Sequence, residues 1–120
     1  RQCKFFDNHP DYFSNPQETR ECNTAWLAFP ILIKEGAPFT RKEFQIFLEK
    51  RNIQTRVVFT GNILRQPMCQ NISKKVLEEG YPNADRVMAK GVLLPLHHGM
   101  TETMFIRLHA TIDEFIGQYE

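Results

Sequence analysis

Residues 101–119 read TETMFIRLHATIDEFIGQY, and their apolar positions repeat with the period of an α-helix. These positions follow one another at intervals of one, three or four residues: Met104, Phe105, Leu108, Ile112, Phe115, Ile116 and Tyr119. Thr101 precedes them and belongs to a residue type that is preferred at helix N-caps. The stretch therefore predicts an amphipathic last helix whose apolar face packs on the rest of the domain.

Three short segments before this helix are rich in β-branched, aromatic or other apolar residues, as strands are. They span residues 26–33, 55–59 and 91–94. Pro30 lies in the first segment and cannot donate a ladder hydrogen bond, so we expect an edge or bulged position there. The three segments predict a small three-stranded sheet.

Two further helices are predicted between these strands. Thr40 and Glu43 have the T-x-x-E spacing of a capping box, and a helix is expected from there to about Arg51. Pro82 introduces a second, shorter helix. Residues 1–23 show neither the helical nor the strand period, and we expect an irregular lead-in. The sequence thus predicts an α+β domain, with a sheet covered by helices, over residues 24–120.

Composition excludes several classes of partner. The chain has 120 residues and a formal net charge of +1, so no broad basic surface is available for nucleic acid or an anionic membrane. No apolar run is long enough to span a membrane. Three widely spaced cysteines indicate neither a disulfide framework nor a metal site, which favours a cytoplasmic location.

One loop concentrates polar donors behind the second predicted strand. Residues 55–67 read TRVVFTGNILRQP and contain Arg56, Asn62, Arg65 and Gln66 but no acidic residue. Guanidinium and amide groups suit phosphate, hydroxyl or ketone oxygens, and Gly61 allows a backbone to approach a ligand closely. On composition and spacing alone, an ordinary turn with two solvated arginines is the more economical interpretation.

The neighbouring histidines His97 and His98 carry no metal-site pattern. Adjacent residues seldom direct two imidazoles at one ion, and no third ligand has suitable spacing. A structured loop before the last helix is the favoured interpretation.

The order of three motifs resembles the C-terminal third of the DegT/StrS family of vitamin B6-dependent sugar aminotransferases and dehydratases. They are Ala25-Trp26 through Pro30, the string at residues 55–67, and LPLHHGMT at residues 94–101. The likeness covers about residues 24–117. The string R-x-x-F-x-G-N-x-x-R-Q-P is similar to that of the nucleotide-sugar 3-dehydrase branch, which removes the C3 hydroxyl of nucleotide-linked 4-keto-6-deoxyhexoses.

The resemblance implies a larger, homodimeric enzyme with pyridoxal 5'-phosphate or pyridoxamine 5'-phosphate in a separate N-terminal domain. Residues 24–120 would then be the small C-terminal domain that closes over the sugar. Because Arg1 is not an initiator methionine, we expect the chain to be part of a longer gene product. Tyr12 and Phe13 are expected to contact the large domain.

Substrate-binding residues follow from the same resemblance. Carrying the motif over residue by residue implies contacts to the nucleotide-linked sugar by Arg56, Phe59, Asn62, Arg65 and Gln66. Asn62 and Arg65 flank the turn and are the first choices. No lysine has the surroundings of an imine-forming residue, so no catalytic residue is assigned.

Two alternatives remain open from the sequence. The chain can belong to an aminotransferase of the same family, or it can be a freestanding α+β interaction module. The residues encoded before Arg1 distinguish these readings. The resemblance implies a His in place of the imine lysine for a dehydrase and a Lys for an aminotransferase.

Overall fold

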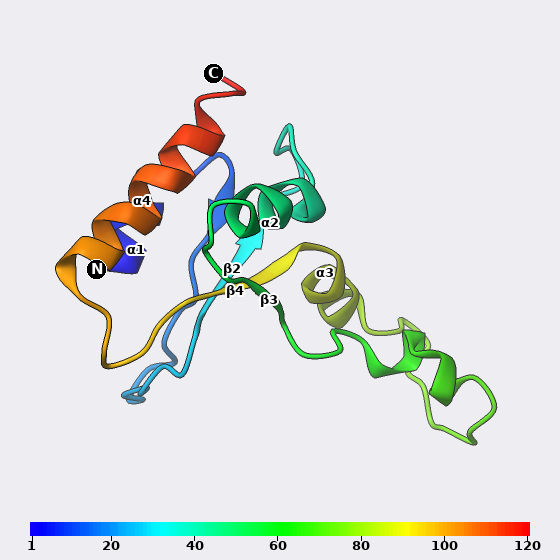
Figure 1. The fold of residues 1–120 in the computed structure, drawn as a ribbon. Helices are drawn as coiled ribbons and strands as arrows, with labels where there is room; N and C mark the ends of the chain where they lie inside the picture. The colour runs from blue at the N-terminus through cyan, green and yellow to red at the C-terminus, as the bar shows by residue number, and fades with distance from the viewer.

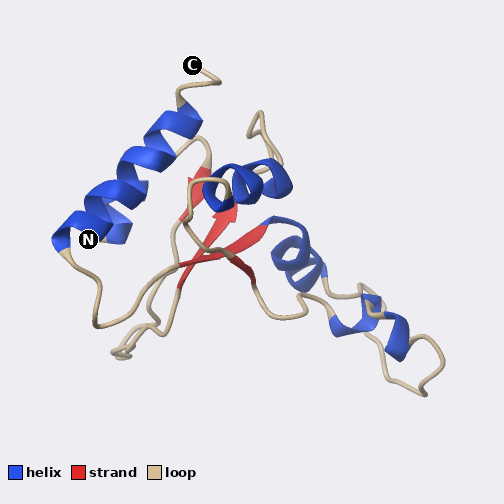
Figure 2. Cartoon of the chain, in the orientation of Figure 1, coloured by secondary structure: helices blue, strands red, loops and turns tan.

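Four antiparallel strands form the sheet at the centre of the computed structural model, which describes residues 1–120 (Figures 1 and 2). The strand order is β1-β2-β4-β3. The elements along the chain are α1 (Gln2–Phe6), β1 (Phe13–Ser14), β2 (Phe29–Ile33), α2 (Arg41–Glu49), β3 (Arg56–Val57), α3 (Pro82–Lys90), β4 (Gly91–Leu94) and α4 (Glu102–Ile116). The predicted α+β class is confirmed, and the sheet has one strand more than predicted.

The lead-in at residues 1–23 is not irregular throughout, which corrects the prediction. It contains α1 and the edge strand β1, which pairs Phe13 with Ile33 and Ser14 with Leu32. Phe6 and Phe13 are buried in the core, and Tyr12 packs against it. These aromatic side chains therefore bury apolar surface within this chain, and Phe13 is not available to another domain.

Strand β2 is an interior strand rather than the edge strand that Pro30 suggested. It pairs with β4 from Phe29↔Leu94 to Leu32↔Gly91 and with β1 on its other side. The proline is tolerated because β1 reaches only Leu32 and Ile33, so Pro30 has a strand neighbour on one side alone.

The hydrophobic core lies between one face of the sheet and the helices α1, α2 and α4 (Figure 1). Along β2 the side chains alternate between buried and half-buried, as expected for one face turned to a core. Helix α3 contacts β2 and β4 but contributes no buried residue to this core.

Both predicted helix starts are confirmed. Thr40 and Glu43 form the reciprocal capping box of α2, and the Thr101 hydroxyl accepts a hydrogen bond from the Met104 backbone N–H. The predicted apolar face of α4 is buried only from Leu108 onward, because Phe105 is half-buried and Met104 is exposed. The first turn of α4 thus lies outside the buried core, and the Arg1 guanidinium lies 4.8 Å from the centroid of the Phe105 ring.

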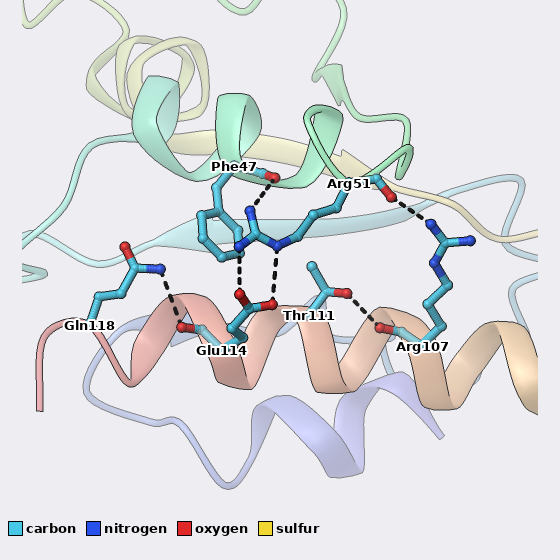
Figure 3. A network of polar contacts seen from close by, with 6 residues as sticks. All are labelled: Phe47, Arg51, Arg107, Thr111, Glu114 and Gln118. Atoms are coloured by element: carbon cyan, nitrogen blue, oxygen red, sulfur yellow. Dashed lines mark hydrogen bonds and ion pairs between the residues drawn. The ribbon is translucent and has the colours of Figure 1, made fainter.

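A polar network fixes α2 to α4 along one side of the core (Figure 3). The Arg51 guanidinium lies 3.4 Å from the centroid of the Phe47 ring and donates two hydrogen bonds to the Glu114 carboxylate. Arg107 of α4 donates to the Arg51 carbonyl at 2.7 Å. These contacts orient the two helices, and none of them involves a residue of the loop at residues 55–67.

One segment, residues 58–81, extends away from the sheet and is called the arm below (Figure 1). The radius of gyration is 16.0 Å, whereas a compact domain of this length has about 14 Å. Asn62 is the only buried residue of the arm. None of the helices combines the length and the hydrophobicity that a membrane span requires.

Candidate functional site

The loop at residues 56–67 begins with β3 and then turns back against helix α3. Phe59 and Gly61 both have positive φ angles, of 48° and 65°. Such angles cost little for glycine but are uncommon for an aromatic residue. A Cβ atom added at Gly61 would lie 2.2 Å from the Cβ of Met88, so the loop backbone rests directly on α3.

Asp85 of α3 joins the two residues that the sequence placed first. Its Oδ1 accepts hydrogen bonds from Asn62 Nδ2 at 2.8 Å and from Arg65 Nε at 3.0 Å. Its Oδ2 accepts from Arg65 Nη2 at 2.9 Å, which completes a bidentate ion pair. Asn62 is 5% exposed, and its Oδ1 also accepts a hydrogen bond from the Leu64 N–H.

The network keeps Asp85 ionised over a wide pH range. Hydrogen bonds from Arg65 and then from Asn62 lower the pKa of the Asp85 carboxyl from its ordinary value to about 2. The same pair raises the pKa of Arg65. The pKa of the Asp85 carboxyl is lower in the folded chain than in the unfolded chain. The stability that the pairing contributes is therefore fully present above the ordinary pKa of an aspartate and is lost as pH falls through about 2.

The other predicted site residues have different environments. Gln66 Nε2 donates to the Thr60 carbonyl at 3.0 Å and closes the loop on itself. The Phe59 side chain is 87% exposed. Arg56 is exposed, and its guanidinium donates hydrogen bonds to its chain neighbours: to the Thr55 carbonyl at 3.3 Å and, with the Gln54 amide oxygen turned toward it, to Gln54 at 2.8 Å. The exposed side chains of Arg56 and Phe59 are therefore accessible to a ligand. Asn62, Arg65 and Gln66 also stabilise the loop itself.

The five predicted residues are divided among separate shallow hollows rather than gathered in one pocket. Asn62 and Arg65 share a hollow of about 340 Å³ with Asp85, Lys74 and Tyr81, among others. Phe59 and Gln66 lie at a second hollow of about 310 Å³. Arg56 borders a third, between α2 and β3.

Asp85 is the residue that sequence reasoning missed. The loop itself lacks an acidic residue, and the anion is supplied by a helix that begins fifteen or more residues after it. Its one local signal was the helix predicted after Pro82, which places an Asp in the first turn, where carboxylates are favoured.

The residues present do not fit a pyridoxal phosphate site. No lysine is buried: Lys34 and Lys74 donate to backbone carbonyls, and Lys90 lies 3.6 Å from Glu35. No group of three His, Cys, Asp or Glu side chains is placed to hold a metal ion. His97 and His98 are exposed, and His97 Nδ1 accepts a hydrogen bond from the Gly99 N–H at 3.1 Å, as in a structured loop.

Comparison with known proteins gives the family. A sequence model of the DegT/DnrJ/EryC1/StrS aminotransferase family matches residues 4–113. The chain therefore belongs to this family of PLP-dependent sugar aminotransferases and dehydratases, as the motifs suggested.

Two curated relatives align with most of the chain. The lipopolysaccharide biosynthesis protein RfbH of Salmonella typhimurium is 31% identical over 89% of this chain and 24% of its own length. The dTDP-4-dehydro-2,6-dideoxy-D-glucose 3-dehydratase of Saccharopolyspora spinosa is 32% identical over 86% of this chain and 22% of its own. The chain thus spans about a quarter of the length of these relatives.

Solved structures share the fold. The Escherichia coli GDP-4-keto-6-deoxy-D-mannose-3-dehydratase with bound hydrated PLP superposes with a TM-score of 0.79 at 22% identity, over 90% of this chain and 27% of that one. A DegT DnrJ EryC1 StrS aminotransferase from Brucella abortus gives 0.74 at 17% identity, over 94% of this chain and 28% of that one. Dehydratases and aminotransferases are therefore both among the structural neighbours.

Proposed function

We propose that residues 24–120 are the C-terminal small domain of a larger PLP- or PMP-dependent 3-dehydratase that acts on a nucleotide-linked 4-keto-6-deoxy sugar. The observation that carries this proposal is the 32% identity to a named 3-dehydratase over 86% of the chain. The R-x-x-F-x-G-N-x-x-R-Q-P string at residues 56–67 supports the same branch. Deoxysugar synthesis for surface lipopolysaccharide, by a cytoplasmic homodimer, completes the proposal.

In this proposal the loop at residues 56–67 contacts the sugar nucleotide, and the chemistry takes place elsewhere. Arg56 and the outward N–H groups of Arg65 are suited to phosphate or sugar oxygens, and the exposed ring of Phe59 offers an apolar contact to the ligand. The cofactor belongs to the part of the larger protein that lies outside this chain, since no residue here fits it.

The exposure of the arm supports a role as one face of a larger assembly. Several large apolar side chains of the arm are exposed to solvent, and Phe59 and Met68 are the most exposed of them. Several large apolar side chains exposed on one segment are typical of an interaction site. The partner proposed here is the remaining three quarters of the same enzyme.

An aminotransferase of the same family is the second candidate. It is favoured by the superposition on the Brucella abortus aminotransferase over 94% of the chain. The residues encoded upstream of Arg1 test the choice directly, because the family resemblance implies a His at the imine position for a dehydratase and a Lys for an aminotransferase.

Replacing Arg56 by alanine in the larger enzyme tests the role of the loop. Arg56 is exposed, and its guanidinium bonds only to the adjacent Thr55 and Gln54, so we expect its loss to leave the fold unchanged. If it donates a charge-assisted hydrogen bond to the sugar nucleotide, kcat/KM falls by about ten- to a hundred-fold.

The matched control is Arg86→Ala, which removes an exposed arginine of α3 that lies outside the loop. We expect this variant to keep the parental kcat/KM. Equal turnover by the Arg56 and Arg86 variants and the parent would remove Arg56 from the proposed site.

A further inference from the structure

The carboxylate of Asp85 is the meeting point of the loop and helix α3. Three donors from two loop residues converge on it: Asn62 Nδ2, Arg65 Nε and Arg65 Nη2, all at 2.8–3.0 Å. The donors come from a segment more than fifteen residues earlier in the chain, so this contact is tertiary rather than local.

We infer that Asp85 is a positioning residue that holds the Arg65 guanidinium and the Asn62 amide in one fixed arrangement on helix α3. A bidentate pair restrains both the place and the plane of a guanidinium, which a single hydrogen bond does not. Both polar atoms of the Asn62 amide are hydrogen bonded, since its Nδ2 donates to Asp85 and its Oδ1 accepts from the Leu64 N–H.

A second contact on the same face of α3 also holds the loop in place. Met88 lies three residues after Asp85, so the two side chains share one face of α3. The Gly61 backbone packs directly against Met88, where no Cβ has room. The loop is therefore held on α3 by one apolar and one polar contact, one turn of helix apart.

The pairing leaves part of Arg65 free in a defined direction. Asp85 engages Nε and Nη2, whereas Nη1 has no partner within the chain. Lys74 and Tyr81 border the same hollow. Resting on the proposed function, this geometry presents the remaining N–H groups of Arg65 to an oxyanion of the sugar nucleotide, and Asp85 sets their plane.

The positioning itself is measured on the 120-residue chain by NMR, without substrate. In the parent chain the Arg65 Nε–H is expected to exchange slowly with water. The Asp85→Asn substitution keeps the shape of the side chain but places an amide N–H₂ donor opposite one of the Arg65 donors. We expect the Arg65 Nε–H of this variant to exchange at least about tenfold faster. The control is Glu79→Gln, which lines the same hollow without hydrogen bonding to Arg65 and leaves the exchange unchanged.

Unchanged Arg65 Nε–H exchange in folded Asp85→Asn would overturn the inference, whatever the substrate is. Exchange that quickens in Asp85→Asn but not in Glu79→Gln supports it. Dispersion of the core methyl signals, such as those of Ile112, reports whether each variant is folded.

A double-mutant cycle on kcat/KM in the larger enzyme then tests whether Asp85 acts through Arg65. We expect Asp85→Ala to lower kcat/KM in the parent and to have little further effect in an Arg65→Ala background. An equal fold-loss in both backgrounds would contradict positioning of Arg65. Parental turnover by Arg65→Ala alone would instead contradict the proposed role of Arg65 in substrate binding, while the NMR result still decides the positioning.

Discussion

Replacing Phe44 by alanine is expected to lower the free energy of unfolding by about 3–5 kcal/mol. Phe44 is 0% exposed and lies at the centre of the aromatic core, with ring centroids 5.4 Å from Phe13 and 5.3 Å from Phe115. These two rings come from β1 and α4, so the cavity would open where three elements meet. Since a domain is stable by about 5–15 kcal/mol, the variant is expected to be close to unfolding. Urea denaturation followed by circular dichroism measures the change.

Ile46→Ala is the matched control, because Ile46 lies on the same helix but is 43% exposed. We expect a change within about 0.5 kcal/mol for this surface position. Equal effects of the two substitutions would show that α2 does not bury Phe44 against the sheet.

The second large effect is expected at Gly61. An alanine there meets two penalties: a left-handed backbone at φ 65° and a Cβ that would overlap the Cα and Cβ of Met88, which cannot rotate away. Left-handed backbone costs about 1–2 kcal/mol and overpacking about 1–3 kcal/mol. Together the two penalties destabilise the packing of the loop on α3 by about 2–5 kcal/mol, or on the order of thirty- to five-thousand-fold in the local opening equilibrium.

Hydrogen exchange of the amides at residues 61–66 measures this opening. We expect it to quicken by that factor in Gly61→Ala, while global stability changes much less, because the arm buries no apolar side chain. Gly80→Ala separates the two penalties, since Gly80 has φ 69° but nothing within 4 Å of its added Cβ. Equal local effects at both glycines would show that the close approach to Met88 is unimportant.

Local signals were enough to predict most of the helices and their starts. The T-x-x-E spacing at Thr40 and the position of Thr101 gave two helix starts that the structure confirms. Such caps involve residues three apart, so they are visible in sequence. The predicted strand at residues 91–94 is also confirmed, because a short apolar run ended by Pro95 is a local pattern.

Features that depend on pairing between distant segments were not visible. Strand β1 has only two residues, too few to show an alternation, and it forms because Phe13 meets Ile33 across the sheet. Pro30 correctly indicated a position with no hydrogen-bonded strand on one side, but it did not indicate that the rest of its strand is interior. Whether a proline marks an edge strand or only an edge position depends on the length of the neighbouring strand, which sequence does not reveal.

The candidate site was found only in part for the same reason. The motif gave the polar residues of the loop, yet no spacing rule connects Arg65 to Asp85, twenty positions later on another element. Nor did the motif show that its residues divide among separate hollows. Their roles as structural anchors or ligand contacts depend on tertiary pairing.

The product formed by the larger enzyme that contains this chain tests the proposed function most directly. Supplied with its B6 cofactor and a nucleotide-linked 4-keto-6-deoxyhexose, the enzyme should yield a sugar that has lost the C3 hydroxyl, as mass spectrometry and NMR of the product would show. A product that keeps the C3 hydroxyl and carries an amino group at C4 would contradict the dehydratase and establish an aminotransferase.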